Sequence, residues 1–503
     1  MIMLDGLLLG VEVALSWQGL LMCAIGVTLG TVIGVLPGIG VLASVSLLMP
    51  ITFGYPPAIG LIMLSGVFYG AAYGGSTTSI LMNLPGTANT AVTCLDGHPM
   101  AQQGRAGVAL FITTIASFIG SIGGAIVLAV LSMPLANLAR NFGSQEYLAV
   151  MVLGLMAAAA FATYGLARAM AMTALGILIG LIGIDLNTGL ERYTFGMPSL
   201  FDGVPIVAIA IGLFGLPEVL ANLSRRDEAP PPVISVTLRE MLPTREDMRR
   251  STPSMVRGGL VGCLFGILPG AGSLLASFMS YAVERNSSKT PEKFGTGMIE
   301  GIAGPETANN AAIQTAFIPT LSLGVPGDST MAIVLVALIY HGIDPGPNFV
   351  TQHPNIFWGL IVSFLIGNLM LLVLNLPFIG LWVKMLRIPN SILYPAIVVF
   401  SCIGVYSVRL MPSDLFLMAG CAVLGYLMRS FRLDAPPLLL GFVLGPMMEE
   451  HFRRTLLISR GDPAAFLSTG LTWGIYLLMI AMVGWSLWRN ALTRRRVKAQ
   501  AAG

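Results

Sequence analysis

Long apolar runs separated by short polar corners dominate this sequence. A transmembrane helix needs roughly 20 apolar residues to cross a hydrocarbon core of about 30 Å. Counting interrupted segments as well, the pattern predicts an all-α polytopic membrane protein with roughly 12 transmembrane helices. The apolar runs cover residues 7–35, 108–130, 147–183, 205–223, 357–382, 392–408, 415–428, 436–448 and 472–488.

The composition supports an integral membrane protein. Of 503 residues, 55% are hydrophobic and 10% are charged, and the mean hydropathy is +0.82, far from the usage of soluble domains. The first residues carry Asp5 and no basic cluster, so we do not expect a cleaved signal peptide. The five cysteines are scattered without a Cys-x-x-Cys spacing, as expected of packing residues.

Basic residues form two clusters. Arginines are concentrated in the polar interval 224–257 and in the C-terminal tail, and the positive-inside rule places both in the cytoplasm. No aromatic interleaving accompanies them, so nucleic-acid binding is not indicated. The chain is therefore predicted to consist of a first membrane repeat (1–223), a cytoplasmic polar linker (224–254), a second membrane repeat (255–489) and a basic cytoplasmic tail (490–503).

Two Pro-Gly motifs occur once in each half. "GVLPGIG" at 34–40 returns as "GILPGAG" at 266–272, 232 positions later. "NLPGTANTA" at 83–91 returns as "GVPGDSTMA" at 324–332, 241 positions later. Because both matches occur in the same order, we interpret the halves as related repeats, each with two helix interruptions.

A helix broken at membrane depth has a specific chemical consequence. Proline removes a backbone donor and glycine permits positive φ, so the chain is left with free N–H groups on one side and free carbonyls on the other. Such backbone survives in a membrane only where it is buried in protein or lines a wet cavity. Paired breaks in two repeats are typical of secondary transporters with a site near the midplane. The alternative is that these motifs only kink their helices.

Hydroxyl and amide side chains are concentrated at the interruptions. In the first half, residues 69–91 carry Ser, Thr and Asn without a charge, whereas residues 301–332 in the second half add Glu306 and Asp328. Neutral donors and backbone N–H groups suit a carboxylate, and oxygen ligands suit a hard cation such as Na⁺. Each hydroxyl can equally serve helix packing, and Glu306 can alternatively be a helix-end charge in a cytoplasmic loop.

Other chemistry is not indicated. The sequence has no phosphate-binding loop, no His-Glu-x-x-His and no Gly-x-Ser-x-Gly, so we expect neither an enzyme nor an ATP-driven pump. His98 and His341 follow or precede an aspartate in a pattern typical of turns rather than of a transition-metal site. Arg105 fits an interfacial role better than a substrate contact. No cofactor is expected apart from a coupling ion.

The motif passages resemble a known family. Residues 34–40, 73–107, 266–272 and 304–347 are similar to the large membrane subunit, TctA, of the tripartite tricarboxylate transporter family, and the resemblance covers essentially the whole chain. It implies secondary active uptake across the bacterial inner membrane, driven by a cation gradient, commonly Na⁺. A periplasmic solute-binding protein (TctC-like) would deliver the carboxylate, and a small membrane subunit (TctB-like) would accompany the large one. Members carry citrate and other tricarboxylates, dicarboxylates or aromatic carboxylates.

The residues and the resemblance together give a candidate site at the breaks. By analogy with other transporters that have paired broken hairpins, the repeats are expected to be inverted and to move in an elevator-like step. A passive carboxylate channel, an intramembrane enzyme and a receptor or scaffold subunit are the rival hypotheses. Na⁺ ligands are expected from Gly38, Asn89, Gly270, Thr307, Asn310 and Asp328. Substrate contacts are expected from Pro37, Gly38, Gly40, Ser76, Thr77, Asn83, Pro85, Gly86, Thr87, Asn89, Pro269, Gly270, Gly272, Asn309, Asn310, Pro326, Gly327, Ser329 and Thr330.

Overall fold

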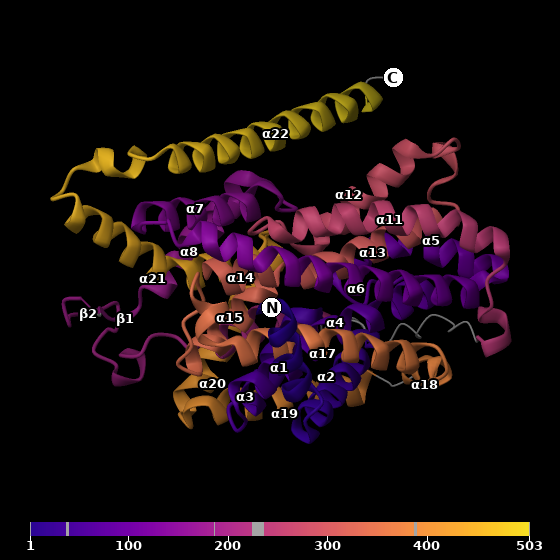
Figure 1. The fold of residues 1–503 in the computed structure, drawn as a ribbon, viewed down its shortest axis with the longest axis horizontal. Helices are drawn as coiled ribbons and strands as arrows, with labels where there is room; N and C mark the ends of the chain where they lie inside the picture. The colour runs from indigo at the N-terminus through magenta and orange to yellow at the C-terminus, as the bar shows by residue number, and fades with distance from the viewer. Residues whose placement is uncertain (1, 37–39, 186, 224–235, 387–389, 502–503) are drawn as a thin grey trace.

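The fold is almost entirely helical (Figure 1). One short antiparallel hairpin, β1 (Gly183–Ile184) with β2 (Glu191–Arg192), is the exception among the described residues. The predicted all-α class is therefore confirmed. The computed structural model describes residues 2–36, 40–185, 187–223, 236–386 and 390–501.

The first half contains α1 (Ile2–Ala14), α2 (Trp17–Val35), α3 (Gly40–Thr52), α4 (Pro57–Met82), η1 (Ala88–Thr90), α5 (Ala91–Met100), η2 (Ala101–Arg105), α6 (Ala106–Ala139), α7 (Ser144–Ala160), α8 (Leu166–Gly180), η3 (Pro198–Leu200), α9 (Ile206–Ala210), η4 (Ile211–Gly215) and α10 (Leu216–Leu223). The first predicted run, 7–35, is divided between α1 and α2. Ser16 causes the division, because its Oγ accepts a hydrogen bond from Gly19 N at 3.0 Å and caps α2.

The second half contains η5 (Leu238–Met241), α11 (Arg245–Ile267), α12 (Gly272–Ser287), η6 (Pro291–Lys293), α13 (Glu300–Thr315), α14 (Phe317–Leu323), α15 (Ser329–Tyr340), α16 (Phe349–Gln352), α17 (Pro354–Asn375), α18 (Ile379–Met385), α19 (Asn390–Arg409), α20 (Pro412–Ser430), α21 (Ala435–Ile458), η7 (Pro463–Leu467) and α22 (Gly470–Ala501). Helix α11 begins within the stretch predicted as the polar linker. Its first turn is capped by Thr244, whose side chain accepts from Asp247 N.

Several helices are suited to a membrane. In the described part of the chain, four helical stretches are long and apolar enough to span one: 17–35, 57–82, 88–139 and 354–375. Shorter apolar helices, including α3, α7, α8 and α15, accompany them. The structure thus supports a multi-pass membrane protein, while a total of about a dozen crossings stays a prediction.

Glycines bring α2 and α4 into close contact. Gly26, Gly30 and Gly34 repeat every four residues along α2, and a Cβ at any of them would collide with the backbone of α4. At Gly30, for example, it would lie 2.5 Å from the carbonyl oxygen of Val67. Small residues at this spacing are a typical interface between membrane helices.

The second half repeats this interface between α11 and α13. Gly258, Gly262 and Gly266 occupy the same spacing on α11 and press against α13, as Gly262 does against Ala308. Gly262 follows Gly30 by 232 positions and Ala308 follows Val67 by 241 positions, the same two offsets that relate the Pro-Gly motifs. The two halves therefore share a packing arrangement as well as motifs.

Helices α4 and α13 form the centre of the molecule. Every residue of α4 after Pro57, and every residue of α13 after Glu300, is buried. Each is also packed against a helix from the other half, since α6 runs along α13 and α17 runs along α4. Helix α22 instead lies along α7 at one edge and extends away from the bundle (Figure 1).

Candidate substrate and cation site at the helix breaks

The first Pro-Gly motif interrupts its helix in both halves. Helix α2 ends at Val35 and α3 begins at Gly40, while α11 ends at Ile267 and α12 begins at Gly272. Gly40 and Gly272 are equivalent positions, and both adopt positive φ, +72° and +67°. This conformation favours glycine strongly, so the motif's last glycine ends the break in the same way twice. The predicted site residues Pro37 and Gly38 lie outside the described residues.

The second motif also ends a helix in both halves. Asn83 follows α4 with φ 55°, and Gly324 follows α14 with φ 68°. Both are left-handed C-caps, the conformation that glycine and asparagine tolerate best. Because Asn83 and Gly324 are 241 positions apart, the broken helices predicted at the Pro-Gly motifs are present and have matching geometry.

The two breaks of the second half are bonded to each other. Gly270 N donates to Gly327 O at 2.9 Å, and Gly327 N donates to Thr320 Oγ1 at 3.2 Å. Gly272 also has little room, because a Cβ there would lie 3.0 Å from Cβ of Asp328. Free backbone groups left by one break are thereby partly satisfied by the other.

The two breaks of the first half also meet. Thr78 on α4 donates to the carbonyl of Val35, the last residue of α2, at 2.5 Å. A Cβ at Gly86 would lie 2.6 Å from both Gly34 O and Gly75 Cα. Only a glycine fits where the second break approaches the end of α2 and the side of α4 so closely.

One contact joins the breaks of the two halves. Asn89, in η1 directly after the second break of the first half, donates from Nδ2 to Ser273 Oγ at 2.7 Å. Ser273 lies in the first turn of α12, directly after the first break of the second half. The motifs, which lie far apart in the sequence, therefore converge in one region. We call it the break cluster and define it by the described residues 34–36, 40, 83–90, 268–273 and 324–330.

Accessibility differs within the break cluster. Asn83 and Pro85 are exposed, and Asn89, Gly270, Asp328 and Ser329 are partly exposed, whereas Thr87 and Thr330 are buried. Asp328 caps α15, with Oδ1 accepting from the N–H groups of Thr330 and Met331 at 2.9 Å each. Pro269 and Pro326 are buried. The cluster thus offers an accessible carboxylate, an amide and helix ends to a ligand.

Several predicted site residues lie away from the breaks. Thr307 donates to the Ala303 carbonyl of its own helix. Asn310 turns toward α6, where its Nδ2 donates to Ser117 Oγ at 2.9 Å. Ser76 and Thr77 are buried in α4, and Ser76 contacts the carboxyl of Glu306. Ser76 and Asn310 belong to a second polar group, centred on Glu306. The sequence had left Glu306 open between a site residue and a helix-end charge in a loop.

Asn309 is a different case. Only 1% of its surface is exposed. Neither its amide oxygen nor its amide nitrogen has a hydrogen-bond partner in the described chain. It shares a helix face with Ala316, seven residues on, and Ala316 packs against Gly327, where a Cβ would lie 2.8 Å away. A buried, unpaired amide is costly unless a ligand or water completes its hydrogen bonds.

The predicted turn at Asp96–Pro99 is wrong, because these residues lie within α5. Asp96 is fully buried, and its Oδ1 accepts from the N–H groups of Gly295, Gly297 and Met298 at 2.8–2.9 Å. Its carboxylate is thus satisfied by a loop of the second half and needs no local turn. Within the described residues, no group of three or more His, Cys, Asp or Glu is arranged to hold a metal ion.

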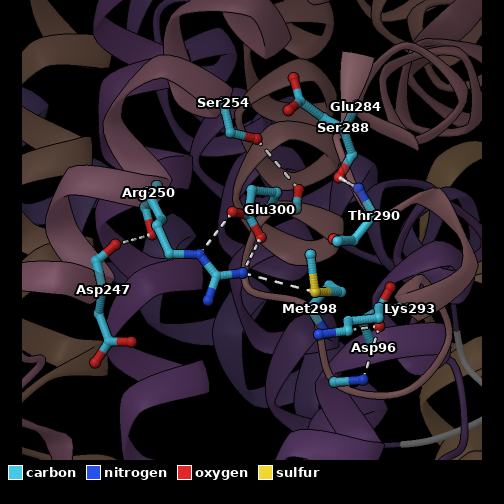
Figure 2. Close-up of polar contacts among 12 residues, drawn as sticks. Asp96, Asp247, Arg250, Ser254, Glu284, Ser288, Thr290, Lys293, Met298 and Glu300 are labelled. Atoms are coloured by element: carbon cyan, nitrogen blue, oxygen red, sulfur yellow. Dashed lines mark hydrogen bonds and ion pairs between the residues drawn. The ribbon is translucent and has the colours of Figure 1, made fainter. Parts of the chain in front are cut away.

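Ion pairs lie near the N-terminal end of α11, and Figure 2 shows the pair between Arg250 and Glu300. Arg250 donates to both oxygens of Glu300 at 2.7 Å and to the sulfur of Met298. Arg105 pairs with Asp247 at 2.5 Å, consistent with its expected interfacial role. Burial works against ionisation of Asp247, but hydrogen bonds from Thr244 and Arg105 outweigh it and lower its pKa.

A helical membrane protein with paired helix breaks that converge in one cluster has the architecture of a membrane transporter. The chain matches the family described as "Tripartite tricarboxylate transporter TctA family" over residues 20–440. It belongs to this family, the large component of tripartite tricarboxylate transporters.

Two similar proteins come from Agrobacterium vitis. One, described as an uncharacterized 52.8 kDa protein in the TAR-I ttuC' 3' region, is 47% identical over 481 residues, which cover 96% of this chain and 95% of that protein. The other, an uncharacterized protein in the TAR-II ttuC' 3' region, is 55% identical over 207 residues, 41% of this chain and 86% of that protein. No solved structure matches the chain.

Proposed function

We propose that this chain carries out secondary active, cation-coupled uptake of a carboxylate such as citrate or another tricarboxylate or dicarboxylate. Na⁺ is the coupling ion in this proposal, and the bacterial inner membrane is the location. A periplasmic solute-binding protein delivers the substrate, and a small membrane subunit completes the complex. Family membership supports the transporter class, and the break cluster supplies the site.

The observation that carries the proposal is the junction between Asn89 and Ser273. It brings the first half's second break against the start of α12, where backbone N–H groups are free of helical partners. Helix starts of this kind favour anions through their N–H groups and dipole. The buried amide of Asn309, which has no hydrogen-bond partner in the described chain, is proposed as a further neutral donor for a carboxylate oxygen.

The coupling cation would neutralise the carboxylate as both enter the low-dielectric interior. Oxygen atoms suited to Na⁺ are present at the breaks in Asp328 and in the backbone of Gly270. By analogy with other transporters that have paired broken hairpins, we propose an elevator-like step. In this step the half-helices that hold the substrate move as a unit against the remaining helices. The interlocked packing of α6 on α13 and α17 on α4 is compatible with such units.

The test is uptake of labelled citrate into proteoliposomes that contain this chain, the small membrane subunit and the binding protein, with and without an inward Na⁺ gradient. We expect gradient-dependent accumulation, and we expect Asn89→Ala to abolish it. Asn348→Ala is the matched control, since Asn348 is exposed and lies outside the break cluster. Absence of accumulation with citrate, dicarboxylates and aromatic carboxylates under both Na⁺ and H⁺ gradients would contradict the proposal.

A further inference from the structure

Glu306 is a carboxylate in the centre of the molecule. It lies on α13 with 1% of its surface exposed, and it is enclosed by side chains from α4, α5 and α6. Ionisable side chains at such a position in a membrane protein are costly and usually have a functional partner. The break cluster does not include Glu306, so its role needs a separate explanation.

Hydroxyl groups are the protein partners of this carboxylate. Thr93 on α5 donates to Oε1, and Ser117 on α6 donates to Oε2 at 3.3 Å. Asn310, one turn further along α13, donates from Nδ2 to Ser117 Oγ at 2.9 Å and to the Glu306 carbonyl at 3.0 Å. Its other amide atom, Oδ1, is buried and has no hydrogen-bond partner in the described chain.

Tight packing fixes these groups together. A Cβ at Gly120 on α6 would collide with the Thr307 carbonyl, and one at Gly124 would lie 2.7 Å from the Ala311 carbonyl. These glycines therefore let α6 approach α13 closely enough for Ser117 to reach Glu306 and Asn310. The arrangement is built by the fold, because α4, α5 and α6 of the first half and α13 of the second half all contribute to it.

In the described part of the chain, no ion pair brings a positive charge to this site. None of the ion pairs formed by the described residues includes Glu306. The titratable groups that act on it from the packed helices are Tyr73 of α4 and Cys94 of α5, and neither type of side chain can carry a positive charge. An isolated buried carboxylate is strongly disfavoured unless a cation or a proton neutralises it.

We propose that Glu306 carries a coupling charge of its own, in addition to the Na⁺ proposed at Asp328 and Gly270, with its carboxylate neutralised by Na⁺ or by a proton. Thr93 Oγ1, Ser117 Oγ and the unpaired Asn310 Oδ1 supply the neighbouring oxygens, the ligand type that Na⁺ prefers. A proton would bind to the carboxylate itself. The inference rests on the proposed cation-coupled function and assigns a further coupling charge to a site next to the break cluster.

The first test separates coupling from substrate binding. Glu306→Gln keeps the size of the side chain and one acceptor oxygen, but it carries no charge for a cation or a proton to neutralise. We expect it to keep exchange of carboxylate across proteoliposomes and to lose gradient-driven accumulation by about tenfold or more. Glu292→Gln is the control, since Glu292 is exposed in η6. Accumulation by Glu306→Gln equal to that of the unmodified chain would overturn the proposal.

The second test needs neither carboxylate transport nor a working variant. Binding of radioactive Na⁺ to the purified chain is measured together with the carboxyl band in infrared difference spectra between acidic and alkaline buffer. Saturable Na⁺ binding, weakened in Glu306→Asp, identifies Na⁺ as the cation, and a carboxyl band that disappears in Glu306→Gln identifies a proton. A chain that shows neither signal overturns the proposal. If Na⁺ binding or the carboxyl band is observed but no carboxylate is taken up, the proposed substrate class is wrong and the role of Glu306 stands.

Discussion

Gly270 allows the break geometry to be tested by one added methyl group. Its φ of +76° lies in the left-handed region, where an alanine costs roughly 1–2 kcal/mol. A Cβ at Gly270 would also collide with the Gly154 carbonyl on α7, and overpacking of this kind costs about 1–3 kcal/mol. Gly270→Ala should therefore lower the free energy of unfolding by about 2–5 kcal/mol, and it should displace the N–H that bonds Gly327.

Gly104 provides a matched control. Its φ is +78°, almost the same as that of Gly270, but a Cβ at Gly104 would meet no atom within 4 Å. Gly104→Ala should lose only the backbone contribution, about 1–2 kcal/mol, and should keep uptake. The assay compares thermal melting of the purified variants with carboxylate uptake in proteoliposomes. Equal losses of stability in the two variants, with uptake retained in Gly270→Ala, would refute the packing argument.

Two further predictions concern aspartates. Asp328→Ala removes the cap of α15 and should lower stability by about 0.5–2 kcal/mol, whereas Asp328→Asn, an equally good cap, should melt like the unmodified chain but take up less carboxylate. Normal uptake by Asp328→Asn would exclude Asp328 as a cation ligand. In the β1–β2 hairpin, the hydrogen bond from Asn187 N to Asp185, helped by Arg192 and Arg453, lowers the pKa of Asp185 from 3.8 to about 2. Because the pKa of Asp185 is lower in the folded than in the unfolded state, the ionised carboxylate stabilises the hairpin, and this stabilisation is lost as pH falls toward the folded value. Local opening of the hairpin, obtained from hydrogen-exchange rates divided by the intrinsic rate at each pH, should therefore rise only between about pH 4 and pH 2. Asp185→Asn should remove this rise, and a rise beginning well above pH 4 in the unmodified chain would contradict it.

The helix breaks were predictable because proline and glycine act locally. The spacing of the Pro-Gly motifs gave the positions at which α2, α4, α11 and α14 end, and the structure has breaks there. The close contacts of α2 were also visible in principle, since Gly26, Gly30 and Gly34 repeat every four residues. A glycine repeat predicts a close helix–helix contact but does not say which helix forms it, so α4 as the partner could not be predicted.

The contacts between the halves could not be predicted. Asn89 meets Ser273 and Asp96 meets Gly295 only because the tertiary packing brings them together, and no local pattern encodes such pairs. Asn310 was placed at the breaks by its neighbours in sequence, but its position on the helix turns it toward α6. The sequence could not decide between a site residue and a helix-end charge for Glu306. Burial of a single carboxylate depends on the helices that surround it, and their packing is not a local property.

The most direct test of the account is a cryo-electron microscopy structure of the chain with the transported carboxylate and its coupling cation bound. The account predicts ligand density in the break cluster, in contact with Asn89, with the backbone between Gly270 and Ser273 and with the start of α15. Carboxylate density elsewhere in the bundle, with the break cluster closed and empty, would contradict the assignment of the helix breaks as the substrate site.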